Sequence, residues 1–86
     1  GPGPEVRASA RTYLWGEVRD AAGTVVTATL ETPEAYAFTA VSAVAAVERT
    51  LAGAVSPGAW TPARAFGPDF VAGLAGVVVG PVLKAE

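Results

Sequence analysis

The chain has 86 residues, a formal net charge of −2 from six basic and eight acidic side chains, and neither cysteine nor histidine. Disulfides and the usual zinc sites are excluded, and the scattered basic residues give no stripe that could follow a nucleic-acid backbone. The length fits one small domain. Because such a core rarely supplies more than about 3 to 5 kcal/mol, we expect self-association to support it.

The two ends of the chain are interpreted separately from its fold. The sequence contains no Met and opens with Gly1-Pro2-Gly3, which we interpret as the remnant of a cleaved expression tag, so that residues 4–86 form the single domain. The N-terminus carries no secretory signal, and the apolar run 70–83 is shorter than the about 20 residues of a membrane span. We therefore expect a cytoplasmic protein that enters no membrane, and the Ala, Val, Gly and Arg bias indicates a bacterial source.

Residues 11–31 alternate as the two strands of a β-hairpin. The first strand runs from Arg11 to Arg19, Asp20 and Gly23 supply the turn, and the second strand follows as far as Glu31. One face of the hairpin is aliphatic, and the other carries aromatic, charged and threonine side chains. We expect a helix to cover the aliphatic face, which consists of Leu14, Val18, Val26, Ala28 and Leu30.

A long helix is predicted from Pro33 to about Ala52, with Thr32 as its N-cap and Gly53 as its stop. Its core-facing stripe follows spacings of three or four residues and is expected to comprise Tyr36, Ala40, Ala43, Val47 and Leu51. A second apolar set lies elsewhere on the cylinder and consists of Phe38, Val41, Val44 and Ala45. The helix is therefore expected to pack against something on both sides.

The last part of the chain is predicted to form a loop, a second helix and a strand. The loop covers residues 55–66, the helix runs from about Gly67 to Gly76, and residues 77–79 form an edge strand because Gly80 and Pro81 follow it. The resulting order is β-β-α-loop-α-β. It describes a small α+β domain in which an antiparallel hairpin packs on a long helix, and we expect its subunits to meet through a sheet or a helix.

Between Glu31 and Gly67 the hairpin is followed by an ordered set of short motifs. They are Tyr36-x-x-Thr39-Ala40 at the helix start, Leu51-x-Gly53 at its end, and Gly58-x-x-Thr61-Pro62-Ala63-x-Ala65-Phe66-Gly67 in the loop. In their order and spacing these motifs resemble the C-terminal part of saccharopine dehydrogenase-like proteins, especially the bacterial branch named trans-acting enoyl reductases.

The resemblance implies a role for the domain. In that family an N-terminal Rossmann domain holds a nicotinamide cofactor, and a second domain on a largely antiparallel sheet supplies the substrate side and the subunit interface. This chain is similar only to the end of the second domain and has no Gly-x-Gly-x-x-Gly at a strand-to-helix turn. We therefore expect neither a cofactor nor a metal, and no hydride transfer by the chain alone.

Candidate substrate-binding residues lie in the loop and at the start of the long helix. Trp60, Thr61 and Arg64 bring an aromatic surface, a hydroxyl and a guanidinium together, which suits an acyl carboxylate or a phosphate. Tyr36 and Thr39 stand one turn apart, so their oxygens can share a ligand. Each also has a structural interpretation, because Thr61 can cap a turn and Thr39 can bond to a carbonyl of the preceding turn.

Candidate interface residues are Tyr13 and Trp15 on the polar face of the hairpin, with Phe38 and Val41 on the helix. An isolated domain rarely leaves such aromatic side chains in water, so we expect a homodimer. The favoured interpretation is a small dimeric binding module for a hydrophobic acyl or polyketide-type ligand, which resembles the substrate and dimerisation part of the family.

Two alternatives stay open. A stand-alone isomerase or cyclase of natural-product biosynthesis would use Tyr36, Glu17 or Arg64, and it would require an enclosed pocket with a buried ionisable group. A partner subunit of a split reductase would bind a cofactor-bearing protein through the helix face that includes Val44. The sequence points to no particular catalytic residue.

Overall fold

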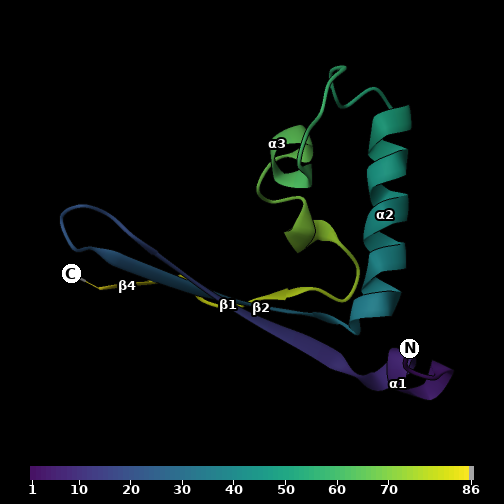
Figure 1. The fold of residues 1–86 in the computed structure, drawn as a ribbon, viewed down its shortest axis with the longest axis horizontal. Helices are drawn as coiled ribbons and strands as arrows, with labels where there is room; N and C mark the ends of the chain where they lie inside the picture. Colours follow the sequence, from purple (N-terminus) through teal and green to yellow (C-terminus); the bar gives the residue numbers. More distant parts are fainter. Residues whose placement is uncertain (86) are drawn as a thin grey trace.

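A computed structural model describes residues 1–85 and shows a small α+β fold with two arms, a long antiparallel sheet and a long helix with short helical segments beside it (Figure 1). The elements in chain order are α1 (Pro4–Ser9), β1 (Arg11–Arg19), β2 (Val25–Pro33), α2 (Ala35–Leu51), α3 (Pro62–Phe66), the 3-10 turn η1 (Val71–Gly73), β3 (Val78–Val79) and β4 (Leu83–Ala85). None of the described helices combines the length and the apolar character that a membrane crossing requires.

The predicted hairpin is confirmed, and its second strand continues two residues beyond the predicted end at Glu31. β1 and β2 pair antiparallel along their whole lengths, with Leu14 opposite Leu30. In the turn, a carboxylate oxygen of Asp20 accepts a hydrogen bond from the Thr24 N–H over 3.0 Å, and Gly23 has a φ of 87°. The two turn residues therefore act as the sequence predicted, one as a side-chain acceptor and the other in a left-handed conformation.

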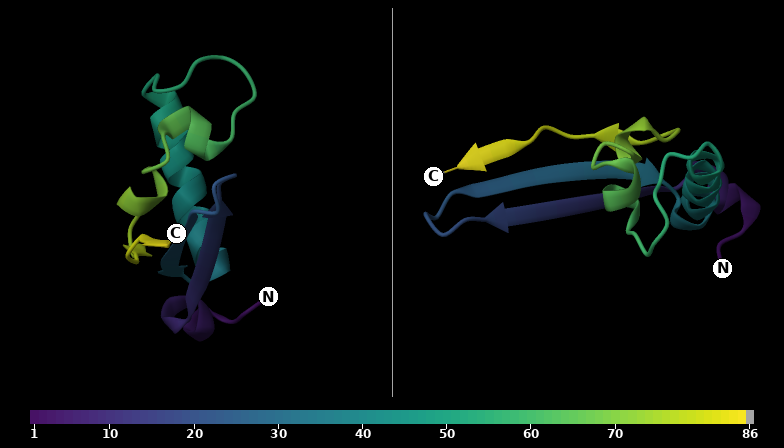
Figure 2. Two further views of the ribbon diagram at one scale, coloured as in Figure 1. Left: turned by 90° about the vertical axis from the view of Figure 1, so that its left-hand side faces the viewer. Right: turned by 90° about the horizontal axis from the view of Figure 1, so that it is seen from above.

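The other side of β2 carries a strand in two pieces. β3 and β4 both pair with β2, so β2 is central and β1 forms the opposite edge (Figure 2). Between the two pieces, the Gly80 N–H donates to the Thr29 carbonyl oxygen over 2.9 Å, and a methyl group on Gly80 would overlap the Thr29 hydroxyl oxygen. The predicted edge strand is confirmed for β3, whereas β4 was not predicted.

The start of α2 differs from the prediction. Thr32 and Pro33 remain in β2, and Glu34 is the N-cap. The two carboxylate oxygens of Glu34 accept hydrogen bonds from the N–H groups of Tyr36 (3.0 Å) and Ala37 (2.9 Å). The prediction was wrong because pairing with β1 continues through residue 33 and keeps the backbone extended, so the next side-chain acceptor takes over the cap.

The end of α2 is where the sequence predicted it. The Gly53 N–H donates to the Thr50 carbonyl oxygen (3.0 Å) and the Ala54 N–H to the Arg49 carbonyl oxygen (3.1 Å), which together form a Schellman motif. Gly53 has a φ of 79°, a conformation that glycine adopts at little cost. The motif satisfies carbonyl groups that the last turn would otherwise leave free, and it turns the chain back toward the helix.

The side of α2 that faces the rest of the chain is not the predicted core stripe. The half-buried positions of α2 include Phe38, Ala45 and Ala46. Ala46 borders a hollow between α2 and α3, and Ala45 borders a second hollow together with Gly73 of η1. The predicted stripe is exposed throughout and consists of Tyr36, Ala40, Ala43, Val47 and Leu51. Both sets are apolar and periodic, so periodicity alone could not say which of them meets the short helices.

The predicted second helix over residues 67–76 is wrong. The second α-helix of the long-helix arm, α3, lies earlier, with Pro62 at its first position, and it ends at Gly67, whose φ is 93°. The following segment forms only turns and η1, because Gly73 and Gly76 interrupt any run long enough for a stable helix.

The hairpin is not covered by α2, contrary to the expected packing. α2 rises from the end of β2, and the hairpin extends away from it (Figure 1). Near the helix, residues 68–72 border a hollow together with Leu14 and Leu30 of the aliphatic face. Farther out, Val18 of the same face is 67 % exposed, so the distal half of the sheet has apolar side chains in contact with solvent.

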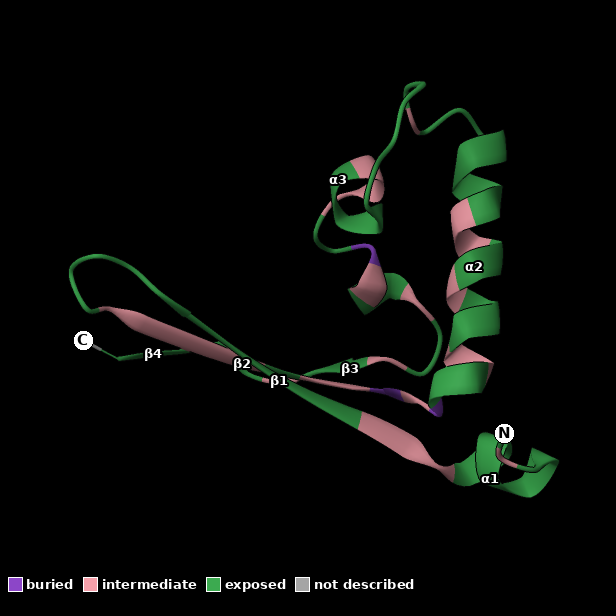
Figure 3. Cartoon of the chain, in the orientation of Figure 1, coloured by how far each residue is buried: buried purple, intermediate pink, exposed green. Residues whose placement is uncertain are grey.

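Burial within one chain is slight. Among residues 1–85, Phe70 is the one large apolar side chain that is buried, at 8 % exposure (Figure 3). The radius of gyration is 15.5 Å, whereas a compact domain of this length has about 12 Å. The accessible surface of 6188 Å² exceeds that of a compact monomer of this size by about 1,500 Å². The fold therefore leaves large apolar areas for contact with another molecule.

Replacing Glu34 by Ala removes both side-chain bonds that cap α2, and we expect the free energy of unfolding to fall by about 1 kcal/mol in urea denaturation. Glu34→Asp keeps a good N-cap acceptor and should recover most of the loss. Glu48→Ala is the matched control, because Glu48 is an exposed glutamate on the same helix without a capping role. An equal loss in both alanine variants would contradict this assignment of the cap.

Candidate functional site

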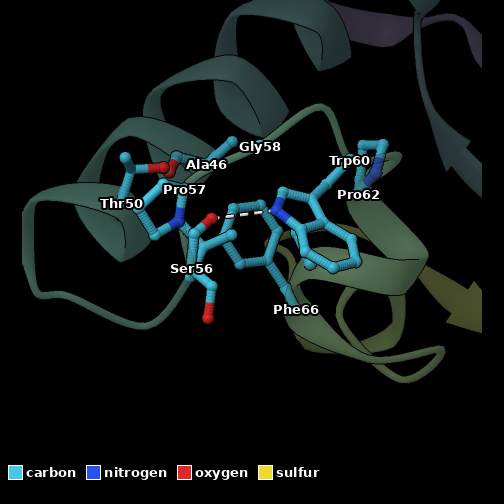
Figure 4. Close-up of a pocket in the computed structure, with 10 residues that line it drawn as sticks. Ala46, Thr50, Ser56, Pro57, Gly58, Trp60, Pro62 and Phe66 are labelled. Atoms are coloured by element: carbon cyan, nitrogen blue, oxygen red, sulfur yellow. Dashed lines mark hydrogen bonds between the residues drawn. The ribbon is translucent and has the colours of Figure 1, made fainter.

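An open, largely apolar cavity of about 490 Å³ lies between the C-terminal half of α2, the loop after it and α3 (Figure 4). Its position follows from the Schellman motif, since the chain reverses at the end of α2 and returns along the helix. The walls consist of Ala46 and Thr50 of α2, loop residues 55–58 and Trp60, and Pro62, Ala65 and Phe66 of α3. No charged side chain is among them.

Trp60 forms one wall of this cavity and is fixed by the loop itself. Its indole Nε1–H donates to the Ser56 carbonyl oxygen over 2.8 Å (Figure 4). A Cβ atom on Gly58 would lie 3.3 Å from that nitrogen, so the loop backbone passes close to the ring. The guanidinium carbon of Arg64 lies 5.6 Å from the centre of the Trp60 ring, which is a cation–π arrangement.

Phe66 connects the cavity with the buried Phe70. The two ring centres are 4.9 Å apart with their planes tilted by 40°. The guanidinium carbon of Arg49 lies 5.2 Å from the centre of the Phe70 ring. Within residues 1–85 neither Arg49 nor Arg64 forms an ion pair. Both guanidinium groups therefore stack on aromatic rings and still have N–H donors for an anionic group.

The chemistry of the cavity walls suits binding rather than acid–base catalysis. Thr50 and Ser56 contribute the hydroxyl groups, and the Thr50 hydroxyl already donates to the Ala46 carbonyl oxygen over 2.8 Å. In the part of the chain that the structure describes, no three acidic side chains group closely enough to hold a metal ion. The cavity can thus enclose an apolar group, with the Arg64 guanidinium beside Trp60 as the nearby cation.

The structure brings together two of the three predicted loop residues. Trp60 lines the cavity and Arg64 stacks on it. Thr61 occupies the N-cap position of α3, where its carbonyl oxygen accepts from the N–H groups of Arg64 and Ala65, and its hydroxyl makes no capping bond. The side-chain cap expected of Thr61 is therefore not formed, and its carbonyl oxygen makes the first hydrogen bonds of α3 instead.

Tyr36 and Thr39 do not reach this cavity. Both lie in the first turns of α2, whereas the helix borders the cavity only at Ala46 and Thr50. The Thr39 hydroxyl donates to the Ala35 carbonyl oxygen over 2.8 Å, which agrees with its structural interpretation. The predicted substrate-binding residues therefore lie in two separate places. Tyr36 and Thr39 are at the N-terminal end of α2, whereas Trp60 and Arg64 lie beside its C-terminal half.

The residues considered for a stand-alone isomerase or cyclase are also separated. Glu17 forms an ion pair of 2.6 Å with Arg19 in the hairpin, Tyr36 is at the start of α2, and Arg64 is in α3. That alternative required a buried ionisable group in an enclosed pocket, and the walls of the cavity contain none.

The candidate interface residues of the hairpin are exposed, as predicted. Tyr13 and Trp15 are 74 % and 64 % exposed, and together with Glu31 they border a hollow of about 380 Å³ on the sheet. On α2 the two candidates are less accessible, because Phe38 is half-buried and Val41 is 37 % exposed. The hairpin thus offers the more open of the two predicted surfaces.

Some residues of the cavity were missed from the sequence. Phe66 was part of a family motif, yet it was not predicted to face a ligand, and residues 55–57 were treated only as a loop. The signal that could have found them is the gathering of Trp60, Phe66 and Phe70 within one short segment. Several aromatic residues in a segment too short for a second core indicate a shared apolar site.

Comparison of the chain with protein-family models, with curated proteins and with solved structures gave no match. The relation to saccharopine dehydrogenase-like proteins thus stays a prediction from the motifs of residues 31–67.

Proposed function

We propose that the chain is a small dimeric binding module that holds a hydrophobic acyl or polyketide-type ligand in the cavity beside Trp60. The observation that carries the proposal is the apolar cavity of about 490 Å³, which is walled by Trp60 and Phe66 and has a stacked guanidinium next to it. This volume lies in the range of about 300 to 1,000 Å³ that small-molecule sites usually have. The resemblance to the substrate part of an enoyl reductase family supports the same ligand class.

The charge around the cavity favours a ligand with an anionic end. Arg64 stacks on Trp60 and has no acidic partner among residues 1–85. Its N–H groups can therefore bind a carboxylate or phosphate while the apolar chain of the ligand lies against Trp60 and Phe66. An acyl carboxylate or an acyl phosphate ester has both parts. A fully neutral ligand would use the apolar walls and leave the guanidinium unused.

The dimeric part of the proposal rests on the uncovered hairpin. Tyr13 and Trp15 border a hollow whose described lining residues all belong to the sheet or the segment that pairs with it. The surplus of accessible surface is about 1,500 Å², compared with about 800 Å² that each partner buries in a standard interface. Aromatic residues are enriched in such interfaces. We therefore assign the face with Tyr13 and Trp15 to contact with a second copy.

A second candidate function is that of a partner subunit in a split reductase. It is favoured by a hollow of about 510 Å³ along α2, bordered by Val41, Val44 and Leu74, which leaves Val44 58 % exposed. A side chain of a cofactor-bearing protein could enter this hollow. Co-purification of the chain with a nicotinamide-binding subunit, lost on Val44→Lys, would favour this function over the binding module.

Decanoate is a suitable probe for the cavity, with decanol as the uncharged ligand of the same length. We expect isothermal titration calorimetry to show binding of both, and Arg64→Gln to weaken decanoate about tenfold without affecting decanol, because a charge-assisted hydrogen bond contributes about 1.5 to 3 kcal/mol. Trp60→Ala should weaken both ligands.

Val82→Ala is the control for the ligand experiment, since Val82 is exposed and outside the cavity. Absence of binding by either ligand, or an equal loss for both in Arg64→Gln, would contradict the proposed site.

Trp15→Lys places a charge in the proposed hairpin interface, and we expect sedimentation equilibrium to show that the mass of the assembly falls by half. The side chain is exposed in one chain, so its replacement removes little internal packing. Val82→Lys adds the same charge at another exposed position on the opposite edge of the sheet and should leave the mass unchanged. A wild-type mass equal to one chain at micromolar concentrations would refute the dimer.

A further inference from the structure

One side of α2 carries an apolar stripe of exposed side chains; its Ala40 also borders a hollow with Gly73 and Leu74, and the Tyr36 ring lies close to Gly1. We call this stripe the outer α2 face and define it by Tyr36, Ala40, Ala43, Val47 and Leu51. These residues follow spacings of four, three, four and four, so they form one stripe about 23 Å long on a helix with a rise of 1.5 Å per residue. Leu51 is 83 % exposed and Val47 56 %, which is unusual for aliphatic side chains in a continuous stripe.

The charged side chains of α2 lie off this stripe. Arg49 points to the opposite side, where it stacks on Phe70, and Glu48 follows Val47 by one residue and therefore lies about 100° away around the helix. A solvent-facing helix surface normally carries charged residues, whereas a stripe with a 4-3-4 repeat and no charges is the pattern of a helix that packs against another helix.

We propose that the outer α2 face binds the same face of a second copy as an antiparallel helix pair. In the register that places residue pairs adding to 87 opposite each other, Tyr36 meets Leu51 of the other copy and Ala40 meets its Val47. Each bulky side chain then lies against a smaller or a flexible one, and Ala43 lies close to the two-fold axis. The alanines allow the two backbones to approach closely at the centre of the contact.

The helix dipoles favour the antiparallel arrangement. A parallel pair would align the two helix dipoles side by side, which is unfavourable. In the antiparallel register each helix N-terminus lies near the C-terminus of the other, where the two ends of the dipoles attract. A face that fits itself in this way needs no partner of different sequence.

The available surface is sufficient for this second contact. The accessible surface exceeds that of a compact monomer by about 1,500 Å², and a standard interface buries about 800 Å² per partner. The hairpin contact proposed above would use about half of the surplus, and the outer α2 face lies on the other arm of the molecule (Figure 1). Two two-fold contacts per chain, with perpendicular axes that intersect, would join two hairpin dimers into a closed tetramer.

The first test is a pair of lysine substitutions on α2. Val47→Lys introduces a charge at the middle of the outer α2 face, and we expect sedimentation equilibrium to show half the wild-type mass. Thr39→Lys adds the same charge at an exposed position of the same helix, but about 80° around the helix from Val47, and should keep the wild-type mass. The combination of Val47→Lys with Trp15→Lys should yield single chains, while Trp15→Lys alone leaves the α2 pair intact.

The second test uses the absence of cysteine, because one introduced thiol can cross-link only to its own copy. Ala43→Cys should form a covalent dimer on mild oxidation, since a disulfide needs Cα atoms within about 7 Å and this residue lies near the two-fold axis. Leu51→Cys should not cross-link, because in the antiparallel register the two copies of this residue are about 22 Å apart along the helices.

The outcomes separate this inference from the hairpin dimer. We expect Ala43→Cys to form covalent dimers and Leu51→Cys to form none. We also expect Val47→Lys, but not Thr39→Lys, to halve the mass. These results do not depend on the outcome for Trp15→Lys. Cross-linking of Leu51→Cys would instead show a parallel pair. If folded Ala43→Cys stays uncross-linked, or if Val47→Lys keeps the wild-type mass, the outer α2 face does not bind a second copy and the inference is wrong.

Discussion

The structure depends on one constraint: α2 has two apolar faces, and the other residues of the chain cover only one of them. The inner side packs beside α3 and η1, where Phe70 is buried, and the outer side remains exposed. The hairpin, which could have covered the second face, extends away from the helix because β2 continues to Pro33 and α2 begins at a capped Glu34. The direction of the chain at this junction therefore decides which apolar surfaces are left for other molecules.

Local chemistry made the hairpin and the end of α2 predictable. The Asp20 and Gly23 turn fixes the hairpin register, and the glycine at position 53 ends α2 through backbone bonds that depend on few residues. The helix start was not predictable in the same way, because Thr32 and Glu34 are both acceptable caps and the ladder with β1 chooses between them. Likewise, both sides of α2 carry apolar side chains at helical spacing. Only the path of residues 62–73 decides which side is covered.

The candidate site was predictable in part for similar reasons. Trp60 and Arg64 are close in sequence and are joined by a single turn, so their contact follows from local structure. The walls contributed by Ala46 and Thr50 depend on how the loop returns along α2, which no spacing in the sequence reveals. The inner side of α2 helps to form the proposed ligand cavity, and its outer side and the hairpin are the surfaces that we propose for association. Ligand binding and assembly would then use different surfaces of the same two arms.

We propose that association with further copies completes a fold that a single chain leaves open. The most direct measurement is the thermal unfolding midpoint of the wild-type chain, followed by circular dichroism from about 1 to 100 μM protein, because binding to the folded state alone makes the midpoint depend on concentration. The account predicts that the midpoint rises by several degrees over this range. A midpoint that is the same at all concentrations would contradict it.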